Sequence, residues 1–463
     1  MADAVLEEDA GYRDVLIFGT HTRILETGRT SAPADLTDPA LGMQVELADG
    51  GWRQLRATSL DAGLSSITNV PAGRAFLTYG PDIFVETAAD VVDLSFSQLG
   101  RGDVQFATAP TPVTLNFTGL EPWAANEYFG VTSLNADVFR ESVLASTASI
   151  PLGSTTGTGT FDWAASRHGL IDATRGDLSL ITQHSARVVG TTTLYRAISR
   201  AATVNSITLQ SGQTTSVAVP LTPAGPLSSL DIDWRTTDWE ALATQTGLGA
   251  TLSRQTLSLH SLPGITNFLR VAPGLVFLGA NPGAAPIQGT VSWNNPFPAA
   301  WPVIVYQRAF FSHRVVALGL ESAWVQLAID ASELGPLSGM LTPRMGPPGA
   351  VRINGEDANA NLVGVGLTPT VSWSAPALGT ATRYQLMLIE ATASAGQLDL
   401  RPVAQLLTRA TSVRLPPGFL VPGSTCVLWV GAETWGTNDL ERKPFEVGLP
   451  ARVVGVMTQP FTP

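Results

Sequence analysis

The sequence predicts an all-β protein, with several β-sandwich (immunoglobulin-like) domains in series and at most short helices. Three observations predict this class. Short runs of apolar and β-branched residues, many of them alternating with period two, recur along the chain. Turn-forming residues separate these runs, with 44 glycines and 32 prolines in all. Charged residues make up only 14% of the chain, against roughly 25% in average soluble domains.

Length, charge and cysteine content narrow the class further. At about 100–200 residues per domain, 463 residues are too many for one ordinary core. A formal net charge of −11 argues against a nucleic-acid partner, because phosphate binding needs a concentrated basic surface. The single cysteine, Cys426, excludes an internal disulfide framework and multi-cysteine metal sites. No run approaches the roughly 20 apolar residues that span a bilayer.

The first predicted domain covers residues 13–95 and follows an acidic tail at residues 1–12. Its strands are expected at residues 15–25, 42–47, 52–58 and 75–79. Asp49-Gly50-Gly51 has the composition of a hairpin turn, and Val70-Pro71-Ala72-Gly73 that of a second turn. Three segments resemble the carboxypeptidase regulatory-like (transthyretin-like) domain: Leu41-Gly42 before a strand, Asp61-Ala-Gly63 in a turn, and Asn69-Val-Pro-Ala-Gly73 before another strand. The resemblance implies an accessory β-sandwich without catalytic residues.

Residues 96–343 form a central β-rich region, predicted as one large sandwich or two smaller ones with a boundary near residues 225–235. One short helix is expected inside it. Thr237 and Glu240 have the spacing of a capping box, and Trp239, Leu242 and Ala243 would share its buried face.

The last predicted domain covers residues 346–455, and residues 456–463 are expected to form a tail. Trp373 ends one strand, Tyr384 opens the next, and Leu420-Val-Pro-Gly-Ser424 leads into an apolar strand that starts near Cys426. This pattern resembles a fibronectin type III domain. Cys426 stands where that family usually places the tyrosine of the tyrosine corner, so the hydroxyl bond of that motif is missing.

The whole string of modules also resembles modular surface lipoproteins of unknown function from GC-rich Gram-negative bacteria. That resemblance implies an exported protein. The acidic opening would suit a mature secreted protein or lipoprotein whose signal peptide is absent, so a lipid anchor could belong to the unprocessed form. We therefore expect an extracellular or outer cell-surface location.

No catalytic motif is recognisable. None of the five histidines begins His-x-x-Glu or His-Glu-x-x-His, so a zinc hydrolase site is not predicted. The sequence also lacks a Gly-x-Ser-x-Gly elbow, a phosphate loop and a dinucleotide fingerprint. We expect a non-enzymatic protein with no catalytic residues, no metal and no cofactor.

Two groups of residues are candidates for function. The first is an aromatic turn rich in amides, which would suit a glycan or peptide ligand if its rings are exposed: Trp293, Asn294, Asn295, Phe297 and Trp301. The second is a polar cluster that could perform acid–base work: Asp162, His168, Asp172, Asp177 and His184. The alternative for the first group is ordinary core, and for the second a solvated turn.

The sequence also contains Arg-Gly-Asp twice, at Arg101–Asp103 and Arg175–Asp177. An Arg-Gly-Asp loop can present its charges to an adhesion receptor. Gly and Asp are favoured in turns anyway, so we interpret both tripeptides as turn chemistry.

These observations favour an exported, non-enzymatic surface protein that acts in adhesion, scaffolding or ligand binding through loops on rigid sandwiches. Its partner would be a glycan or a protein at the cell surface. Two alternatives remain open: a cell-surface hydrolase with a site in the central region, for which glycans are one candidate substrate class, and a subunit of an extracellular assembly.

Overall fold

The computed structural model describes residues 12–80, 82–143, 148–166, 168–247, 249–264, 273–334, 340–436 and 439–463. Within these ranges the protein is all-β, as predicted, and its α-helix is α1 (Thr236–Ala243). Two 3-10 turns, η1 (Ala164–Ser166) and η2 (Ala173–Arg175), complete the helical structure. Across the same ranges, no helix has the length and apolar character needed to cross a membrane.

One long sheet connects most of the chain. Its strands, in the order in which they pair, are β14 (Val138–Val143), β13 (Tyr128–Ser133), β17 (Ser179–Val189), β18 (Thr193–Val204), β23 (Gly274–Ala280), β22 (Thr251–Ser261), β25 (Val303–Ala317), β26 (Leu320–Glu333), β36 (Ala451–Met457), β35 (Thr425–Trp435), β32 (Arg383–Ser394), β33 (Gln397–Thr408), β9 (Ile83–Glu86), β8 (Arg74–Tyr79), β4 (Gly42–Glu46) and β5 (Trp52–Arg56). These neighbours are antiparallel except β33 and β9, which run parallel with Gln405 opposite Ile83. Short strands β20 (Thr222–Pro223), β30 (Leu362–Val363) and β37 (Phe461–Thr462) join the same sheet.

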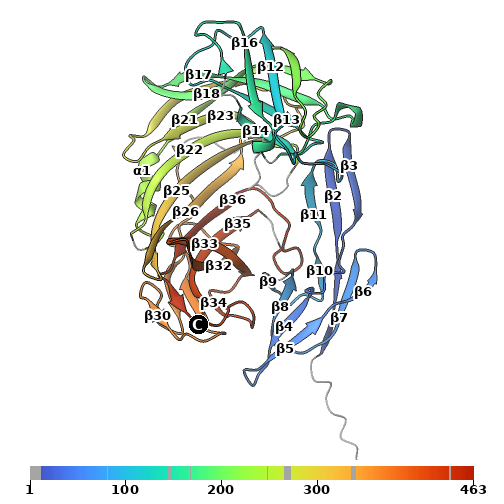
Figure 1. Cartoon of the computed structure of the whole chain (residues 1–463). Helices are drawn as coiled ribbons and strands as arrows, with labels where there is room; N and C mark the ends of the chain where they lie inside the picture. The colour runs from blue at the N-terminus through green and yellow to red at the C-terminus, as the bar shows by residue number, and fades with distance from the viewer. Residues whose placement is uncertain are drawn as a thin grey trace, which may run out of the picture.

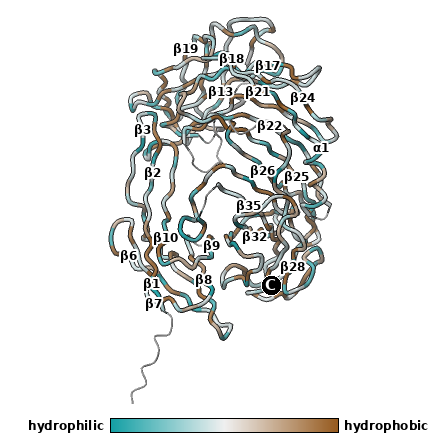
Figure 2. The backbone as a smooth tube through the Cα atoms, turned by 180° about the vertical axis from the view of Figure 1, so that it is seen from behind, coloured by the Kyte–Doolittle hydropathy of each residue, from teal (hydrophilic) through white to brown (hydrophobic). Residues whose placement is uncertain are grey.

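The long sheet bends into an arc, and a separate three-stranded sheet closes the arc into a ring (Figure 1). We call this second sheet the arm. It consists of β11 (Phe96–Leu99), β2 (Thr20–Leu25) and β3 (Gly28–Pro33), in that order. The arm extends from the N-terminal strands to the central region, and Figure 2 shows the same ring from behind, with α1 on its outer side.

Four smaller sheets pack on the long sheet, and each closes a hydrophobic core. In pairing order they are β10 (Val91–Asp93), β1 (Arg13–Phe18), β7 (Leu64–Val70) and β6 (Thr58–Asp61); β15 (Ala148–Ser149), β16 (Thr156–Asp162), β12 (Pro112–Thr118) and β19 (Thr215–Pro220); β24 (Ile287–Asn294), β21 (Leu227–Trp234) and β27 (Met340–Leu341); and β29 (Glu356–Asp357), β28 (Gly349–Ile353), β31 (Thr370–Ser374) and β34 (Ser412–Arg414). Successive side chains of a strand point to opposite faces, so one face of the long sheet fills these cores while the other faces the inside of the ring.

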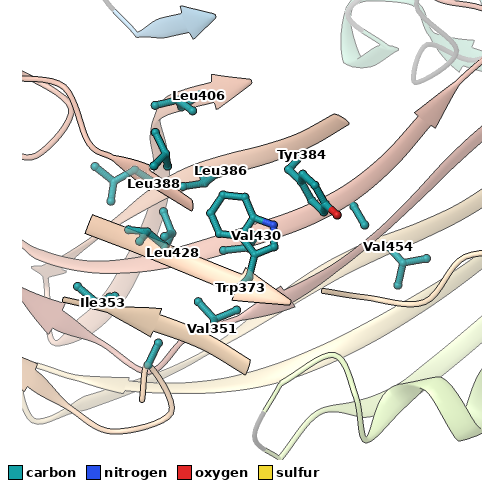
Figure 3. Packing of buried hydrophobic residues seen from close by; sticks show 14 of the residues in the cluster. Val351, Ile353, Trp373, Tyr384, Leu386, Leu388, Leu406, Leu428, Val430 and Val454 are labelled. Atoms are coloured by element: carbon teal, nitrogen blue, oxygen red, sulfur yellow. The ribbon is translucent and has the colours of Figure 1, made fainter. Parts of the chain in front are cut away.

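The C-terminal sandwich has the strand arrangement of a fibronectin type III-like module. One sheet contains β28, β31 and β34, and the other contains β33, β32, β35 and β36. Figure 3 shows Trp373 between the two sheets, with Tyr384 beside it. Their ring centroids lie 5.3 Å apart at an interplanar angle of 64°, an edge-to-face contact. Cys426 is buried in the same core.

The central region contains two hydrophobic cores that share the long strands β17 and β18. Ile181 and Val204 belong to the core under β12, β16 and β19. Val189 and Tyr195, near the other ends of the same strands, belong to the core under β21 and β24. Because neighbouring cores are built on shared strands, the modules of this protein are joined side by side through one sheet and are not connected only by linkers.

Two details differ from the sequence-based expectations. Helix α1 buries Trp239, Leu242 and Ala243 as expected, but its N-cap is Arg235, without a side-chain cap bond. The capping box was wrong because the Glu240 carboxylate accepts from Gly283 N instead. The C-terminal residues are also not a free tail, since Phe461 is 2% exposed and lies opposite Cys426. The predicted N-terminal tail lies, except for Tyr12, outside the described residues.

Candidate functional site

A central cavity of about 980 Å³ lies inside the ring. One wall is the inner face of β26, β32, β33, β35 and β36, and the opposite wall comes from the arm and from residues 443–447. The sequence segments that meet here lie far apart in the chain, with Phe96 on one wall and Trp429 on the other. The ring closure itself therefore creates this cavity.

The floor of the cavity is the indole ring of Trp429, which lies flat on the sheet. On β35 the inward positions are Val427, Trp429, Gly431, Glu433 and Trp435, as the period-two alternation requires. A Cβ atom at Gly431 would lie 2.2 Å from the Trp429 ring, and a Cβ atom at Gly455 on β36 would lie equally close, at 2.2 Å. The two glycines therefore make room for the ring to lie against the backbone.

Beside this floor, Glu433 is held by two donors. Arg383 Nε donates to Glu433 Oε2 at 2.7 Å, and Trp435 Nε1 donates to the same oxygen at 2.6 Å. The guanidinium of Arg383 also lies over the Trp435 ring, 5.1 Å from its centroid, and donates to Pro444 O at 3.1 Å. Charge-assisted bonds of this kind are short and directional, so the carboxylate is fixed in position.

Amide side chains supply further hydrogen-bonding groups on the cavity walls. Gln385 Nε2 donates to Gln405 Oε1 at 2.9 Å, which joins β32 to β33. Gln98 lies on the arm, where its Oε1 is 3.1 Å from His21 Nε2, and the His21 ring stacks on Phe96 at 4.4 Å. The cavity thus has amides on opposite walls, each next to an aromatic or apolar surface.

Among the described residues that line the cavity, positive and negative side chains are equal in number. The positive residues are Arg29, Arg383 and Lys443, and the negative residues are Asp93, Glu433 and Glu446. Arg383 pairs with Glu433, and Lys443 Nζ lies 3.7 Å from Glu446 Oε1. The lining residues that the structure describes therefore carry no net formal charge.

The tip of the arm is fastened to the central region by a set of ionic and hydrogen-bonded contacts that we call the latch: Glu26, Arg101, Asp103, Asn135, Arg175 and Asp177. Arg101 binds Asp177 with two bonds, Nε to Oδ1 at 3.0 Å and Nη2 to Oδ2 at 2.9 Å. Arg101 also pairs with Asp103, at 2.7 Å, and Arg175 pairs with Asp103. The two Arg-Gly-Asp tripeptides therefore bind each other, as a pair of interlocked turns.

Glu26, in the turn between β2 and β3, completes the latch. Its carboxylate accepts from Leu134 N at 3.3 Å and from Leu178 N at 3.2 Å, while its own N donates to Asn135 Oδ1 at 2.9 Å. Burial raises the pKa of Glu26, and these backbone donors oppose the shift.

The aromatic turn predicted from the sequence is not an exposed binding surface. Trp293 is 2% exposed because its position on β24 points into the core, and Phe297 is buried as well. Trp301 is partly buried and stacks on Phe297 at 5.6 Å. The amides shape the local backbone, with Asn294 Nδ2 donating to Gly225 O and Asn295 Oδ1 accepting from Phe297 N.

The predicted polar cluster also has structural roles. Asp162 accepts from Thr111 N and Ala164 N, and Asp172 caps η2 by accepting from Thr174 N. The structure does bring Asp172 and Asp177 together, with Asp172 N donating to Asp177 Oδ2 at 2.8 Å.

The two histidines of the polar cluster lie on different elements, His184 on β17 and His168 between η1 and η2. His184 is buried on β17, where its ring stacks on Tyr128 at 4.5 Å and its Nε2 lies 3.1 Å from Thr182 Oγ1. Burial lowers the pKa of His184 to about 3, so its imidazole is neutral. His168 is partly buried in the segment between η1 and η2. Among the described residues, no group of three His, Cys, Asp or Glu side chains could hold a metal ion.

The residues of the central cavity were missed by the sequence analysis, although one signal pointed to them. The run from Cys426 to Ala432 is apolar at nearly every position. A strand that covers only one core needs apolar residues at alternate positions, whereas a continuous run indicates burial on both faces. The structure shows this second packing face, to which Val427 and Trp429 belong.

The fold thus defines an all-β protein of sandwich modules, one of them fibronectin type III-like. The sequence matches no known family model and no curated protein. A solved structure of the FN1–FN3 domains of chicken CNTN1 is similar at 10% sequence identity, over 78% of this chain and 98% of that one, with a TM-score of 0.13. A TM-score this low supports no argument, so the class assigned here depends on the strand arrangement.

Proposed function

We propose that this protein is a non-catalytic binding protein that holds its ligand in the central cavity. The observation that carries the proposal is the cavity itself: about 980 Å³, lying between the long sheet and the arm and open to solvent, with aromatic rings and amides on its walls. Ligand sites are usually concave and mostly apolar, with a few placed polar groups, and their volumes run from about 300 to 1,000 Å³. Trp324, Phe96 and Phe445 are partly buried cavity residues that could contact a ligand directly.

The hydrolase alternative has less support from the same lining. Acid–base cleavage of a glycoside needs one carboxyl group that carries a proton and a second that is free to act as base or nucleophile. Glu433 is bound by Arg383 and Trp435, Glu446 lies near Lys443, and Asp93 accepts from Ser95 N at 2.8 Å. Each lining carboxylate is thus engaged by a cation or a backbone donor, which favours a binding role.

We place the protein outside the cell, or on the outer cell surface, as part of the same proposal. Low charge density, the scarcity of cysteine and lysine, and a fibronectin type III-like module are compatible with adhesion or scaffolding by an exported protein. Fractionation of the source cells, with immunodetection of this chain after surface proteolysis, tests the location. Recovery of the protein only inside the cell would contradict it.

A second candidate function is that of a subunit in an extracellular assembly, and the exposure of strand β3 favours it. All six residues from Gly28 to Pro33 are exposed, and β3 is the outer strand of the arm. An exposed edge can pair with a strand of another chain. Light scattering after size-exclusion chromatography, over a range of protein concentrations, distinguishes a monomer from an assembly.

Binding in the cavity is tested with a blocking variant. The Gln385→Trp variant places a bulky ring in the cavity, and Trp52→Ala is the matched control, because Trp52 is partly buried on β5 and does not line the cavity. Both variants and the parent protein are screened against arrays of glycans and peptides. We expect Gln385→Trp to abolish binding that Trp52→Ala retains. A ligand that binds equally well to Gln385→Trp would show that its site lies elsewhere.

A further inference from the structure

We infer that an extended peptide binds in the central cavity by adding a strand to the free edge of β11. This inference rests on the proposed binding function and names the class of its ligand. Among the described strands, β11 pairs with β2 and with no other, so its second edge is free. All four of its residues, Phe96 to Leu99, line the cavity, and β11 is the strand of the arm nearest the long sheet (Figure 1). The free edge therefore lies where a ligand of the cavity would meet it.

Two backbone hydrogen bonds show which residues of β11 face β2. Leu94 N donates to Phe18 O at 2.8 Å, and Gly100 N donates to Ile24 O at 3.0 Å. The pairing of β11 with β2 has no register shift. Because alternate residues of a strand direct their backbone groups to opposite edges, the even-numbered residues of β11 bond to β2 and the odd-numbered residues face the free edge.

The odd-numbered residues are Ser97 and Leu99. Within the described ranges, neither their N–H groups nor their carbonyl oxygens have a hydrogen-bond partner. Each residue offers one backbone donor and one acceptor. The two residues are two positions apart, about 6.6 Å at about 3.3 Å per residue. The edge thus presents two donor–acceptor pairs at the interval of a β-strand.

This pattern matches a peptide backbone. An extended peptide carries complementary donors and acceptors at the same interval, and such strand addition is a common mode of peptide recognition. An anion could accept from the two N–H groups, but it would leave both carbonyl oxygens without a donor. A carbohydrate could bond to single groups of the edge, but it could not extend the sheet.

The composition of β11 also favours pairing. Natural proteins protect edge strands with charged residues, proline or bulges. Strand β11 reads Phe-Ser-Gln-Leu, without charge or proline, and it pairs with β2 without a bulge. The opposite wall supplies apolar side chains, including Trp324, Leu327 and Met387. Alternate side chains of an added strand point to one face of the sheet, so one set of them could contact this wall.

Hydrogen exchange of single amides tests the inference. The probes are three immobilised arrays: short peptides rich in Val and Thr, neutral oligosaccharides, and glycans that carry uronate or sialic acid. The tightest binder is then added to the parent protein in solution. We expect this binder to be a peptide that slows exchange of the Ser97 and Leu99 amides. The Gln98 amide already bonds to β2, so its exchange should change less.

A proline variant removes one donor from the edge. Ser97→Pro deletes an N–H that faces away from β2, a position at which edge strands tolerate proline. Ser31→Pro is the matched control on β3. Ala34 N donates to Gly19 O at 3.0 Å, so by the alternation of antiparallel pairs the N–H of Ser31 also faces away from β2, and Ser31 does not line the cavity.

One ladder hydrogen bond is lost in Ser97→Pro, so we expect the Kd of the peptide to rise about five- to tenfold. Ser31→Pro should leave the Kd unchanged. Circular dichroism spectra and melting temperatures establish that both variants are folded. If Ser97→Pro does not fold, the exchange measurement on the parent protein decides the question by itself.

The outcomes separate this inference from the proposed function. A peptide that protects Ser97 and Leu99, and that binds Ser97→Pro and Gln385→Trp more weakly, supports both. A glycan that binds in preference, is blocked in Gln385→Trp and leaves exchange at Ser97 and Leu99 unchanged overturns the peptide inference and keeps the cavity as the binding site. Absence of binding by all three arrays overturns both.

Arg29→Ala distinguishes an anionic ligand from a peptide held by its backbone. Arg29 lines the cavity and has no ion-pair partner in the part of the chain that the structure describes. A ligand that is lost in Arg29→Ala and binds Ser97→Pro as tightly as the parent protein is held by its charge. That result would overturn the peptide inference.

Discussion

Removing the Arg101 side chain should release the arm from the central region. Asp177 has a side chain that is 0% exposed, and Arg101 is 14% exposed, so their two-bond contact is largely shielded from water. Removing one partner of a buried ion pair costs about 3–5 kcal/mol. Since Asp177 keeps the bond from Asp172 N, we expect the lower end, about 3 kcal/mol, for Arg101→Ala. At about 1.4 kcal/mol per factor of ten, the undocked arm becomes about 100-fold more populated.

Arg175→Ala is the matched control, because Arg175 belongs to the second Arg-Gly-Asp tripeptide of the same latch. Arg175 and Asp103 have side chains that are 47% and 59% exposed, and exposed pairs contribute about 1 kcal/mol or less. The assay is native-state hydrogen exchange of the amides of β2 and β11, together with urea denaturation. Equal protection factors for the two variants would refute the argument that burial of Asp177 holds the arm.

Three further predictions concern single residues. Burial lowers the pKa of His184 to about 3 from 6.5. As the pH falls below about 6.5, the unfolded state takes up a proton while the folded state does not, so the free energy of unfolding falls toward pH 3, by up to about 3 kcal/mol at pH 4. Urea denaturation at neutral pH and at about pH 4 should show a smaller loss for His184→Phe than for the parent protein, whereas an equal loss would show that other groups dominate. Cys426 is 1% exposed and burial raises its pKa, so a thiol reagent should label the folded protein slowly and the urea-unfolded protein at once; rapid labelling of the folded state would mean that the C-terminal core opens readily. A methyl group at Gly431 would lie 2.2 Å from the Trp429 ring. The Gly431→Ala variant should therefore tilt the ring into the cavity, lower the free energy of unfolding by about 1–3 kcal/mol and shift the tryptophan fluorescence. An unchanged melting temperature and fluorescence spectrum would contradict the conclusion that Gly431 makes room for the Trp429 ring.

The sequence was informative wherever the determining contacts were local. Trp373 was predicted near the end of one strand and Tyr384 at the start of the next, and the structure places them on β31 and β32, with both side chains in one core. The hairpin at Asp49-Gly50-Gly51 also followed from local turn chemistry, and β4 and β5 pair across it. The amides near Trp293 were misleading, since Asn and Pro mark a nearby turn while strand parity decides that the ring is buried.

The central cavity could not be predicted because it depends on long-range pairing. The flat position of Trp429 requires Gly431 on its own strand and Gly455 on the neighbouring strand. The position of the arm, which forms one wall of the cavity, depends on the ion pair between Arg101 and Asp177. In the sequence, nothing in either Arg-Gly-Asp tripeptide indicates that it contacts the other. Period-two alternation carries information about the faces of a strand, but not about which distant strand will lie beside it.

The parallel contact between β9 and β33 has a consequence for biosynthesis. Ile83 cannot meet Gln405 until more than 300 further residues have left the ribosome. During translation the N-terminal module therefore waits with an open strand edge, exposed to chaperones and to neighbouring nascent chains. Contacts so distant in sequence slow folding, because much of the polypeptide must be ordered before they form. Completion of the ring is consequently a late event, and the cellular yield of this protein should depend on how well that edge is protected in the interval.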